Sequence, residues 1–187
     1  MRADELRAVQ APLKQRYRQD ADAALVTLVA RGDLGEGVSC SVRTGRALAA
    51  AGLHPASGGD GSLLCSGDML LEALVACAGV TLRAVATSLE VPVDAGTVSA
   101  EGELDFRGTL GVDRDAAVGF RAIRLQFDLV SDASDDQLAT LIRLTERYCV
   151  VLQTLKSAPS VSSYRRVPGS AELTPTPLRP MQRRERR

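Results

Sequence analysis

Strict alternation of apolar and polar residues predicts an antiparallel hairpin in the middle of the chain. Apolar side chains occupy every second position over residues 97–106 and, after a loop that contains Gly and Asp, over residues 123–129. Such alternation is typical of strands with one buried and one solvated face. Shorter stretches predict strands over residues 24–30 and 38–42, and Gly32-Asp33 with Gly35-Glu36-Gly37 predicts a turn between them.

Two segments in the first half of the chain follow the helical period. Residues 3–19 are amphipathic, and residues 66–88 are apolar on nearly all sides, which predicts a helix that is buried on most of its surface. Ser66 is expected as the N-cap of this long helix. Glu72 and Arg83 fall on one face of the helix, and we expect them to form an ion pair.

The second half of the chain predicts one more helix and one more strand. Residues 134–137 (Ser-Asp-Asp-Gln) form a capping box, and the helix that they start carries an apolar stripe through Cys149 and ends near Ser157. Residues 160–167 alternate again and predict a strand that closes the sheet. This order of elements predicts an α+β fold with an antiparallel sheet, a long buried central helix and open edges that a dimer partner can pair.

Length and composition narrow the class of protein. The chain has 187 residues, of which 45% are apolar and 3% aromatic, with no Trp and a formal net charge of zero. These values predict one domain with a core of Leu, Val and Ala, and they argue against a disordered chain, an electrostatic nucleic-acid binder and a base-stacking surface. We expect a helical extension over residues 1–22, the folded domain over 23–167 and a flexible tail over 168–187.

The two ends of the chain give further expectations. Met1 is followed by charged residues rather than by an apolar leader, and no run of about 18 apolar residues is present. We therefore expect a cytoplasmic protein with no membrane span. The tail is rich in Pro and holds five Arg against two Glu. A solvated terminus is the preferred interpretation of that tail, and nucleic-acid association through its arginines is the weaker one.

The four cysteines carry the candidate chemistry. In a reducing compartment they are not a disulfide framework, so they are small buried hydrophobes, metal ligands or redox groups. The chain has no Cys-x-x-Cys pair and a single histidine, His54, so we expect no zinc site, no other metal and no bound cofactor. Cys40 falls on the apolar side of its predicted strand, as a structural cysteine would.

Cys77 and Cys149 each interrupt the apolar face of a predicted helix. A thiolate attacks the O–O bond of a peroxide, and a second thiol condenses with the resulting sulfenic acid to form a disulfide. Two helices packed 8–10 Å apart bring two thiols within bridging distance if both point into the seam. Apolar surroundings would favour an alkyl hydroperoxide as substrate. A role in packing is the alternative for both residues, and the residues by themselves leave both readings open.

Three segments together resemble the superfamily of osmotically induced protein C (OsmC) and organic hydroperoxide resistance protein (Ohr), in its OsmC-like branch. Residues 58–61 (Gly-Gly-Asp-Gly) match a Gly-rich loop, and residues 68–77 match a carboxylate-Leu-Leu run that leads to Ala-Cys in a long helix. Residues 149–155 (Cys-Val-Val-Leu-Gln-Thr-Leu) are similar to the second-cysteine motif Cys-Pro-Val-Ser-x-x-Leu. The resemblance covers roughly residues 24–167.

This resemblance implies an OsmC-like fold and an intertwined homodimer with two active sites at its interface. It also implies thiol-dependent reduction of organic hydroperoxides, with a lipoylated or other dithiol reductant supplied from outside. By the same likeness Cys77 is the peroxidatic nucleophile and Cys149 is the resolving thiol.

The sequence departs from the family pattern around the first cysteine. A Glu generally stands ten residues before that cysteine, whereas this chain has Gly67 there and a neighbouring Asp68. Asp68 either supports the thiolate or only complements the helix dipole. Arg43 and Arg46 are candidates for the activating cation, and His54 is a third candidate.

The second motif and a third cysteine leave the function open between two classes. Val150 and Leu152 replace the Pro and Ser of the motif, and Cys65, just before the long helix, competes as a resolving thiol. The leading hypothesis is a thiol peroxidase that acts on organic hydroperoxides. The alternative is a non-catalytic OsmC-like dimer that binds a small apolar ligand or a partner protein, in which both cysteines only pack.

Overall fold

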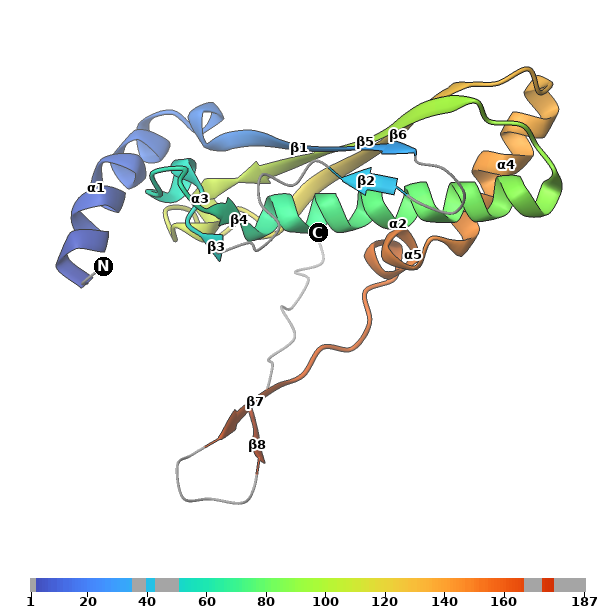
Figure 1. The fold of residues 1–187 in the computed structure, drawn as a ribbon. Coiled ribbons are helices and arrows are strands. Elements are labelled where there is room, and N and C mark those ends of the chain that lie inside the picture. The colour runs from blue at the N-terminus through green and yellow to red at the C-terminus, as the bar shows by residue number, and fades with distance from the viewer. Residues whose placement is uncertain (1–2, 35–39, 43–50, 167–172, 177–187) are drawn as a thin grey trace, which may run out of the picture. The chain divides into compact units, whose positions relative to one another are not determined.

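A four-stranded antiparallel sheet in the order β2-β1-β5-β6 runs through the larger of two units of the chain (Figure 1). The computed structural model describes residues 3–34, 40–42, 51–166 and 173–176. The two units are Met1–Gln153 and Thr154–Arg187. The sheet and its helices confirm the predicted α+β class, while the predicted boundaries at residues 22 and 167 stay a prediction.

The long strands of the sheet follow the predicted alternation. The strands are β1 (Leu25–Leu34), β2 (Cys40–Val42), β5 (Ala95–Asp105) and β6 (Phe120–Val130). Val98 and Ala100 are buried, and they pair across the ladder with Phe127 and Leu125 of β6. The predicted turn is wrong at Gly32-Asp33, because β1 continues to Leu34. The rest of that prediction, residues 35–37, lies outside the described residues. Gly32 and Asp33 pair with β5, and the ladder along a long neighbour outweighs their local preference for a turn.

Helix α2 (Ser66–Leu89) lies along one face of the sheet (Figure 1). Its inner side is fully buried and aliphatic, which explains the near-continuous apolar sequence of this segment. These buried residues are Leu71, Leu74, Val75, Ala78 and Leu82. By length and composition alone α2 is also the one helix, among the described residues, that is long and apolar enough to cross a membrane. A core helix packed on a sheet has the same properties.

The start of α2 differs from the prediction in one residue. Cys65, and not Ser66, is the N-cap, and its Sγ accepts a hydrogen bond from the N–H of Gly67 at 3.4 Å. The helix ends at Leu89, and Glu90 closes it in the left-handed conformation (φ 55°). The expected ion pair between Glu72 and Arg83 is wrong. Eleven residues separate them by about 16 Å along the helix, and Arg83 instead donates to the carbonyl of Val93 at 2.7 Å.

A glycine lets the sheet and α2 approach closely. A Cβ atom on Gly102 would lie 2.3 Å from the ring of Phe120 and 3.3 Å from Leu71 of α2. Gly102 stands in the inward row of β5, so the predicted position of this residue on the buried face is confirmed. The missing side chain leaves room for the aromatic ring that packs beside the helix.

The predicted helix through Cys149 is two helices in the structure. Ser134 and Gln137 form the predicted capping box and start α4 (Asp135–Tyr148), and α5 (Val150–Lys156) follows after one extended residue. That residue is Cys149, with φ −69° and ψ 105°. Val150 and Val151 are β-branched and disfavour a continuous helix at this point. The one-helix prediction is therefore wrong at its most important residue.

The N-terminal segment packs on the opposite end of the sheet from α4. Helix α1 (Ala3–Gln19) confirms the predicted helix, and Tyr17 near its end is buried in a cluster with Ala24, Phe106 and Leu110. The hydroxyl of Tyr17 donates to the carbonyl of Ala56 at 2.7 Å. Short elements complete this end of the unit: η1 (Asp22–Ala24), β3 (Ala51–Gly52), η2 (Pro55–Ser57), β4 (Leu64–Cys65) and α3 (Phe106–Thr109).

The smaller unit holds a two-stranded antiparallel sheet of β7 (Ser163–Arg166) and β8 (Leu173–Thr176). The prediction of a strand over residues 160–167 is thus correct in type. Its expected partner is wrong, because β7 pairs with β8 and not with the central sheet. Strand β8 lies inside the range predicted as a flexible tail.

A buried carboxylate holds the loop between β5 and β6. Asp105 is 3% exposed, caps α3 through the N–H of Arg107, and pairs with the guanidinium of Arg107 at 2.6 Å. Arg107 also contacts Asp113 at 3.2 Å. The hydrogen bonds from Arg107 outweigh burial and lower the pKa of Asp105.

We expect Asp105→Asn to lower the free energy of unfolding by about 2 kcal/mol at neutral pH, because it removes the charge that Arg107 neutralises. A lowered folded-state pKa gives stability that is complete above the unfolded-state pKa of about 3.9 and is lost as pH falls from there. Urea unfolding of wild type and variant between pH 7 and pH 3 checks this. Asp113→Asn is the matched control, with an expected loss below about 1 kcal/mol. Equal losses for the two variants would contradict the central role of Asp105.

Candidate functional site

The thiols of Cys77 and Cys149 meet at the seam between α2 and the junction of α4 and α5. Cys77 lies in the middle of α2 and is half-buried, whereas Cys149 is fully buried at the break between the two helices. A hydrogen bond joins the two side chains. The two thiols are therefore neighbours across this seam.

The surroundings of Cys77 favour its thiolate. Burial raises the pKa of Cys77, but hydrogen bonds from the N–H of Val151, the thiol of Cys149, the hydroxyl of Thr81 and the N–H of Val150 outweigh burial and bring the pKa below its ordinary value. All four groups donate to the sulfur, and such donors stabilise the charged form. Cys77 can therefore act as a nucleophile.

The surroundings of Cys149 favour its protonated form. Burial, together with the hydrogen bond and the charge of Cys77, raises the pKa of Cys149 to about 11. Backbone hydrogen bonds to Leu152 and Val151 oppose this rise but are outweighed. The two pKa values are thus moved apart: hydrogen bonds favour the thiolate form of Cys77, and burial favours the thiol form of Cys149.

The break at Cys149 produces the backbone donors. Because the helix is interrupted, the N–H groups of the first residues of α5 have no intrahelical acceptor and are available to a sulfur atom. Sequence reasoning missed these donors, although one departure from the family motif points to them. A Pro at position 150 would have no N–H, whereas Val150 has one, and this N–H contributes to the hydrogen bonding of Cys77.

The predicted supporting residues lie elsewhere in the same chain. Asp68 is nine residues before Cys77, so the helix separates them by about 13 Å. Burial raises the pKa of Asp68, and the nearby charge of His54 lowers it, so these two residues share a site at the start of α2. His54 accepts the N–H of Ala56 at Nδ1 (3.0 Å) and stacks on Phe106 with ring centroids 5.0 Å apart.

The remaining candidates fall into two groups. Arg43 and Arg46 lie outside the described residues, and the side chain of Cys40 does too. Among the described residues no Arg, Lys or His contributes to the pKa of Cys77. Cys65 is twelve residues before Cys77 on the same helix axis, about 18 Å away. A disulfide needs Cα atoms within about 7 Å, so Cys65 cannot be the resolving thiol within one chain.

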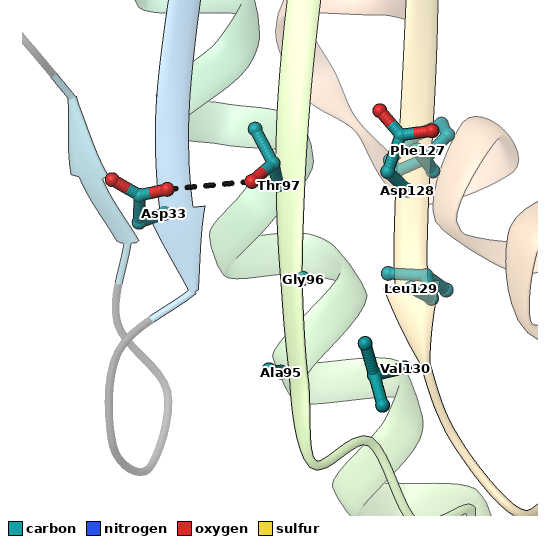
Figure 2. Close-up of a pocket in the computed structure, with 8 residues that line it drawn as sticks. All are labelled: Asp33, Ala95, Gly96, Thr97, Phe127, Asp128, Leu129 and Val130. Carbon is teal, nitrogen blue, oxygen red and sulfur yellow. Dashed lines mark hydrogen bonds between the residues drawn. The ribbon is translucent and has the colours of Figure 1, made fainter.

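Among the hollows that described residues line, two lie on the larger unit, and neither cysteine of the pair lines these two. One, of about 370 Å³, lies beside the start of α2 and has a mainly apolar wall that includes Leu53, Leu70 and Phe106, with His54 and Cys65 at its edge. The other, of about 650 Å³, lies at the end of the sheet, where Figure 2 shows Asp33 and Thr97 joined by a hydrogen bond of 3.4 Å.

Metal binding finds no support in these surroundings. Asp33 and Asp128 both line the second hollow, but no group of three or more His, Cys, Asp or Glu side chains in the described part of the chain is arranged to hold a metal ion. The polar row at this end of the sheet is instead typical of a solvated strand face.

A family model described as OsmC-like protein matches residues 59–163. This range includes α2, the central hairpin, α4 and both cysteines of the pair. No curated protein matches the chain.

Solved structures match the chain in fold. An OsmC-like hydroperoxide resistance protein from Jannaschia sp. CCS1 has a TM-score of 0.61 at 15% identity, over 82% of this chain and 99% of the other. An OsmC-like protein from Mycoplasma pneumoniae has a TM-score of 0.51 at 17% identity, over 72% of this chain and 86% of the other. At such identities the likeness concerns the architecture.

We expect Val150→Pro to raise the pKa of Cys77, because it deletes one N–H donor and little else. Val150 is 70% exposed, and Pro is well tolerated at the first position of a helix. The measurement is the pH dependence of Cys77 alkylation, followed by peptide mass analysis. Val150→Ala keeps the N–H and should leave the titration of Cys77 unchanged. An unshifted titration in the proline variant would show that this donor is unimportant.

Proposed function

This chain belongs to the OsmC-like protein family, and on that premise we propose that it is a thiol-dependent peroxidase that reduces organic hydroperoxides. The observation that carries the proposal is the divided thiol pair, with a lowered pKa at Cys77 and a raised pKa at Cys149. A packing pair of cysteines has no need of four donors directed at one sulfur.

In the proposed cycle the Cys77 thiolate attacks the terminal oxygen of the hydroperoxide. The O–O bond breaks, the alkoxide takes a proton and leaves as an alcohol, and Cys77 becomes a sulfenic acid. The sulfur of Cys149 then attacks the sulfur of Cys77. The S–O bond breaks, the hydroxide leaves with the proton of Cys149 as water, and a disulfide remains. An external dithiol, lipoylated or of another kind, reduces this disulfide and restores both thiols.

The raised pKa of Cys149 fits the order of these steps. A protonated Cys149 donates its hydrogen bond to Cys77 and keeps the first nucleophile activated. Once Cys77 has reacted, its negative charge is gone, and the part of the pKa rise that comes from that charge disappears. Cys149 then becomes easier to deprotonate at the step in which it must attack. We propose that the protein works in the cytoplasm, where dithiol reductants are present.

We also propose that the protein is a homodimer with α2 at its interface. The outer side of α2 carries an exposed apolar stripe at helical spacing, and an unpaired stripe of this kind on a core helix indicates a protein partner. Its members are Met69, Ala73, Val80 and Ala84.

The alternative is a non-catalytic dimer that binds a small apolar molecule. One observation favours it, namely the hollow of about 370 Å³ beside the start of α2, with Leu53 and Leu70 in its wall. The reactivity of Cys77 separates the two functions, because a binding protein needs no thiolate.

We expect one equivalent of an organic hydroperoxide to convert the reduced protein into a form with a Cys77–Cys149 disulfide. Non-reducing peptide mass analysis after rapid quenching identifies the linked peptides. Cys149→Ser should stop at the sulfenic acid, whereas Cys65→Ser should form the disulfide as the wild type does. Slow, scattered oxidation of all cysteines would favour the binding function and sink the peroxidase proposal.

Val80→Asp is expected to shift the protein from dimer to monomer, because it places a charge in the middle of the α2 stripe. Val80 is 38% exposed in the single chain, so a monomer tolerates the change. Light scattering coupled to gel filtration measures the mass. Val130→Asp changes an exposed valine on β6 and is expected to leave the dimer intact. A wild-type protein that is monomeric at micromolar concentration would rule out the dimer.

A further inference from the structure

Thr145 has a buried hydroxyl that the reduced protein leaves without a partner. The residue is fully buried, and its Oγ1 has no hydrogen-bond partner among the described residues. An unsatisfied buried hydroxyl is costly and uncommon in folded proteins. In helices, the hydroxyl of a threonine ordinarily donates a hydrogen bond to the carbonyl four residues earlier. Thr87 of α2 does so, through a bond of 2.8 Å to the carbonyl of Arg83, and Thr145 does not.

The helix places this hydroxyl at the thiol pair. Thr145 is one turn before Cys149 and one turn after Leu141, and all three are fully buried on one side of the chain segment. Leu141 packs against Leu82 of α2, and Cys149 bonds to Cys77 of α2. Thr145 therefore faces α2 between these two contacts.

On α2, the part of the helix next to Cys77 also carries a hydroxyl. Thr81, one turn after Cys77, has a hydroxyl that already bonds the sulfur of Cys77. The neighbouring Ala78 is small and fully buried. The unpartnered hydroxyl is thus directed into the apolar seam that holds the reactive sulfur.

Oxidation of Cys77 adds an oxygen atom to this seam. The oxygen of a sulfenic acid is a hydrogen-bond acceptor, and the Thr145 hydroxyl is a buried donor that, among the described residues, has no partner in the reduced protein. We propose that Thr145 is a catalytic residue whose hydroxyl donates a hydrogen bond to the sulfenic acid oxygen of Cys77 and holds the S–O bond in line for attack by Cys149. This inference rests on the proposed peroxidase function. The bond to be broken is that S–O bond, and the hydroxide leaves as water with the proton of Cys149, so Thr145 itself is unchanged by the cycle.

The test separates formation of the sulfenic acid from its conversion into the disulfide. Both rates are followed by quenched-flow peptide mass analysis after one equivalent of cumene hydroperoxide, with a reagent that traps sulfenic acids. Thr145→Val removes the hydroxyl and keeps the shape. We expect an unchanged rate of sulfenic acid formation and a disulfide rate lowered about tenfold, as for one hydrogen bond lost at the transition state. The thermal midpoint of the reduced variant should not fall, because no hydrogen bond is lost in that state.

Controls make the outcome specific to the hydroxyl. Thr145→Ser keeps a hydroxyl and should resolve close to the wild-type rate, and Thr140→Val on the same helix should change neither rate. If the valine variant does not fold, Thr145→Ala against Thr145→Ser gives the same comparison. If Thr145→Val forms the disulfide at the wild-type rate, the role of Thr145 is overturned and the peroxidase proposal is not. A wild-type protein whose Cys77 gives no sulfenic acid would overturn the peroxidase proposal and this inference together.

Discussion

Packing of α2 on the antiparallel sheet is the constraint on which the rest of the larger unit depends. Leu71, Leu74 and Leu82 bury one side of the helix, and Gly102 in the strand below lets it come close. That contact fixes the rotation of α2. Since the buried side faces the sheet, Cys77 and Thr81 turn towards the flank where α4 packs, and the apolar stripe through Val80 turns outward. The same helix thereby forms part of the core, one wall of the candidate site and the proposed dimer interface.

Where α4 ends against the side of α2, the chain brings hydrogen-bond donors to the sulfur of Cys77. In a continuous helix through Cys149, the N–H groups of Val150 and Val151 would donate to carbonyls of the same helix. The extended conformation of Cys149 frees the first N–H groups of α5, and these groups reach a sulfur that lies in an apolar seam. Burial and hydrogen bonding then act in opposite directions on the two thiols. At Cys77 the donors together outweigh burial and lower the pKa, whereas at Cys149 burial outweighs the backbone donors and the pKa is raised.

The sequence predicted the elements whose pattern repeats over many residues. It failed where the conformation of a single residue determines the structure. Alternation over β5 and β6 and the apolar length of α2 predicted the sheet and its helix, because burial imposes a period on many residues at once. The turn at Gly32-Asp33 failed because pairing with β5 is a non-local effect. The break at Cys149 failed because a single pair of dihedral angles ends α4, and an apolar stripe continues across it. The motifs identified the two cysteines as candidates. Two of the donors around Cys77 are backbone N–H groups, and side-chain types do not predict where such groups lie.

The same hydrogen bonds have a consequence for the electrochemistry of the pair. Donors to the Cys77 thiolate stabilise the reduced state, and they lose their charged acceptor when the disulfide forms. A dithiol whose reduced form is stabilised has a higher reduction potential, so its disulfide is a stronger oxidant. In the proposed cycle these hydrogen bonds would therefore make the Cys77–Cys149 disulfide a stronger oxidant and would favour its reduction by an external dithiol.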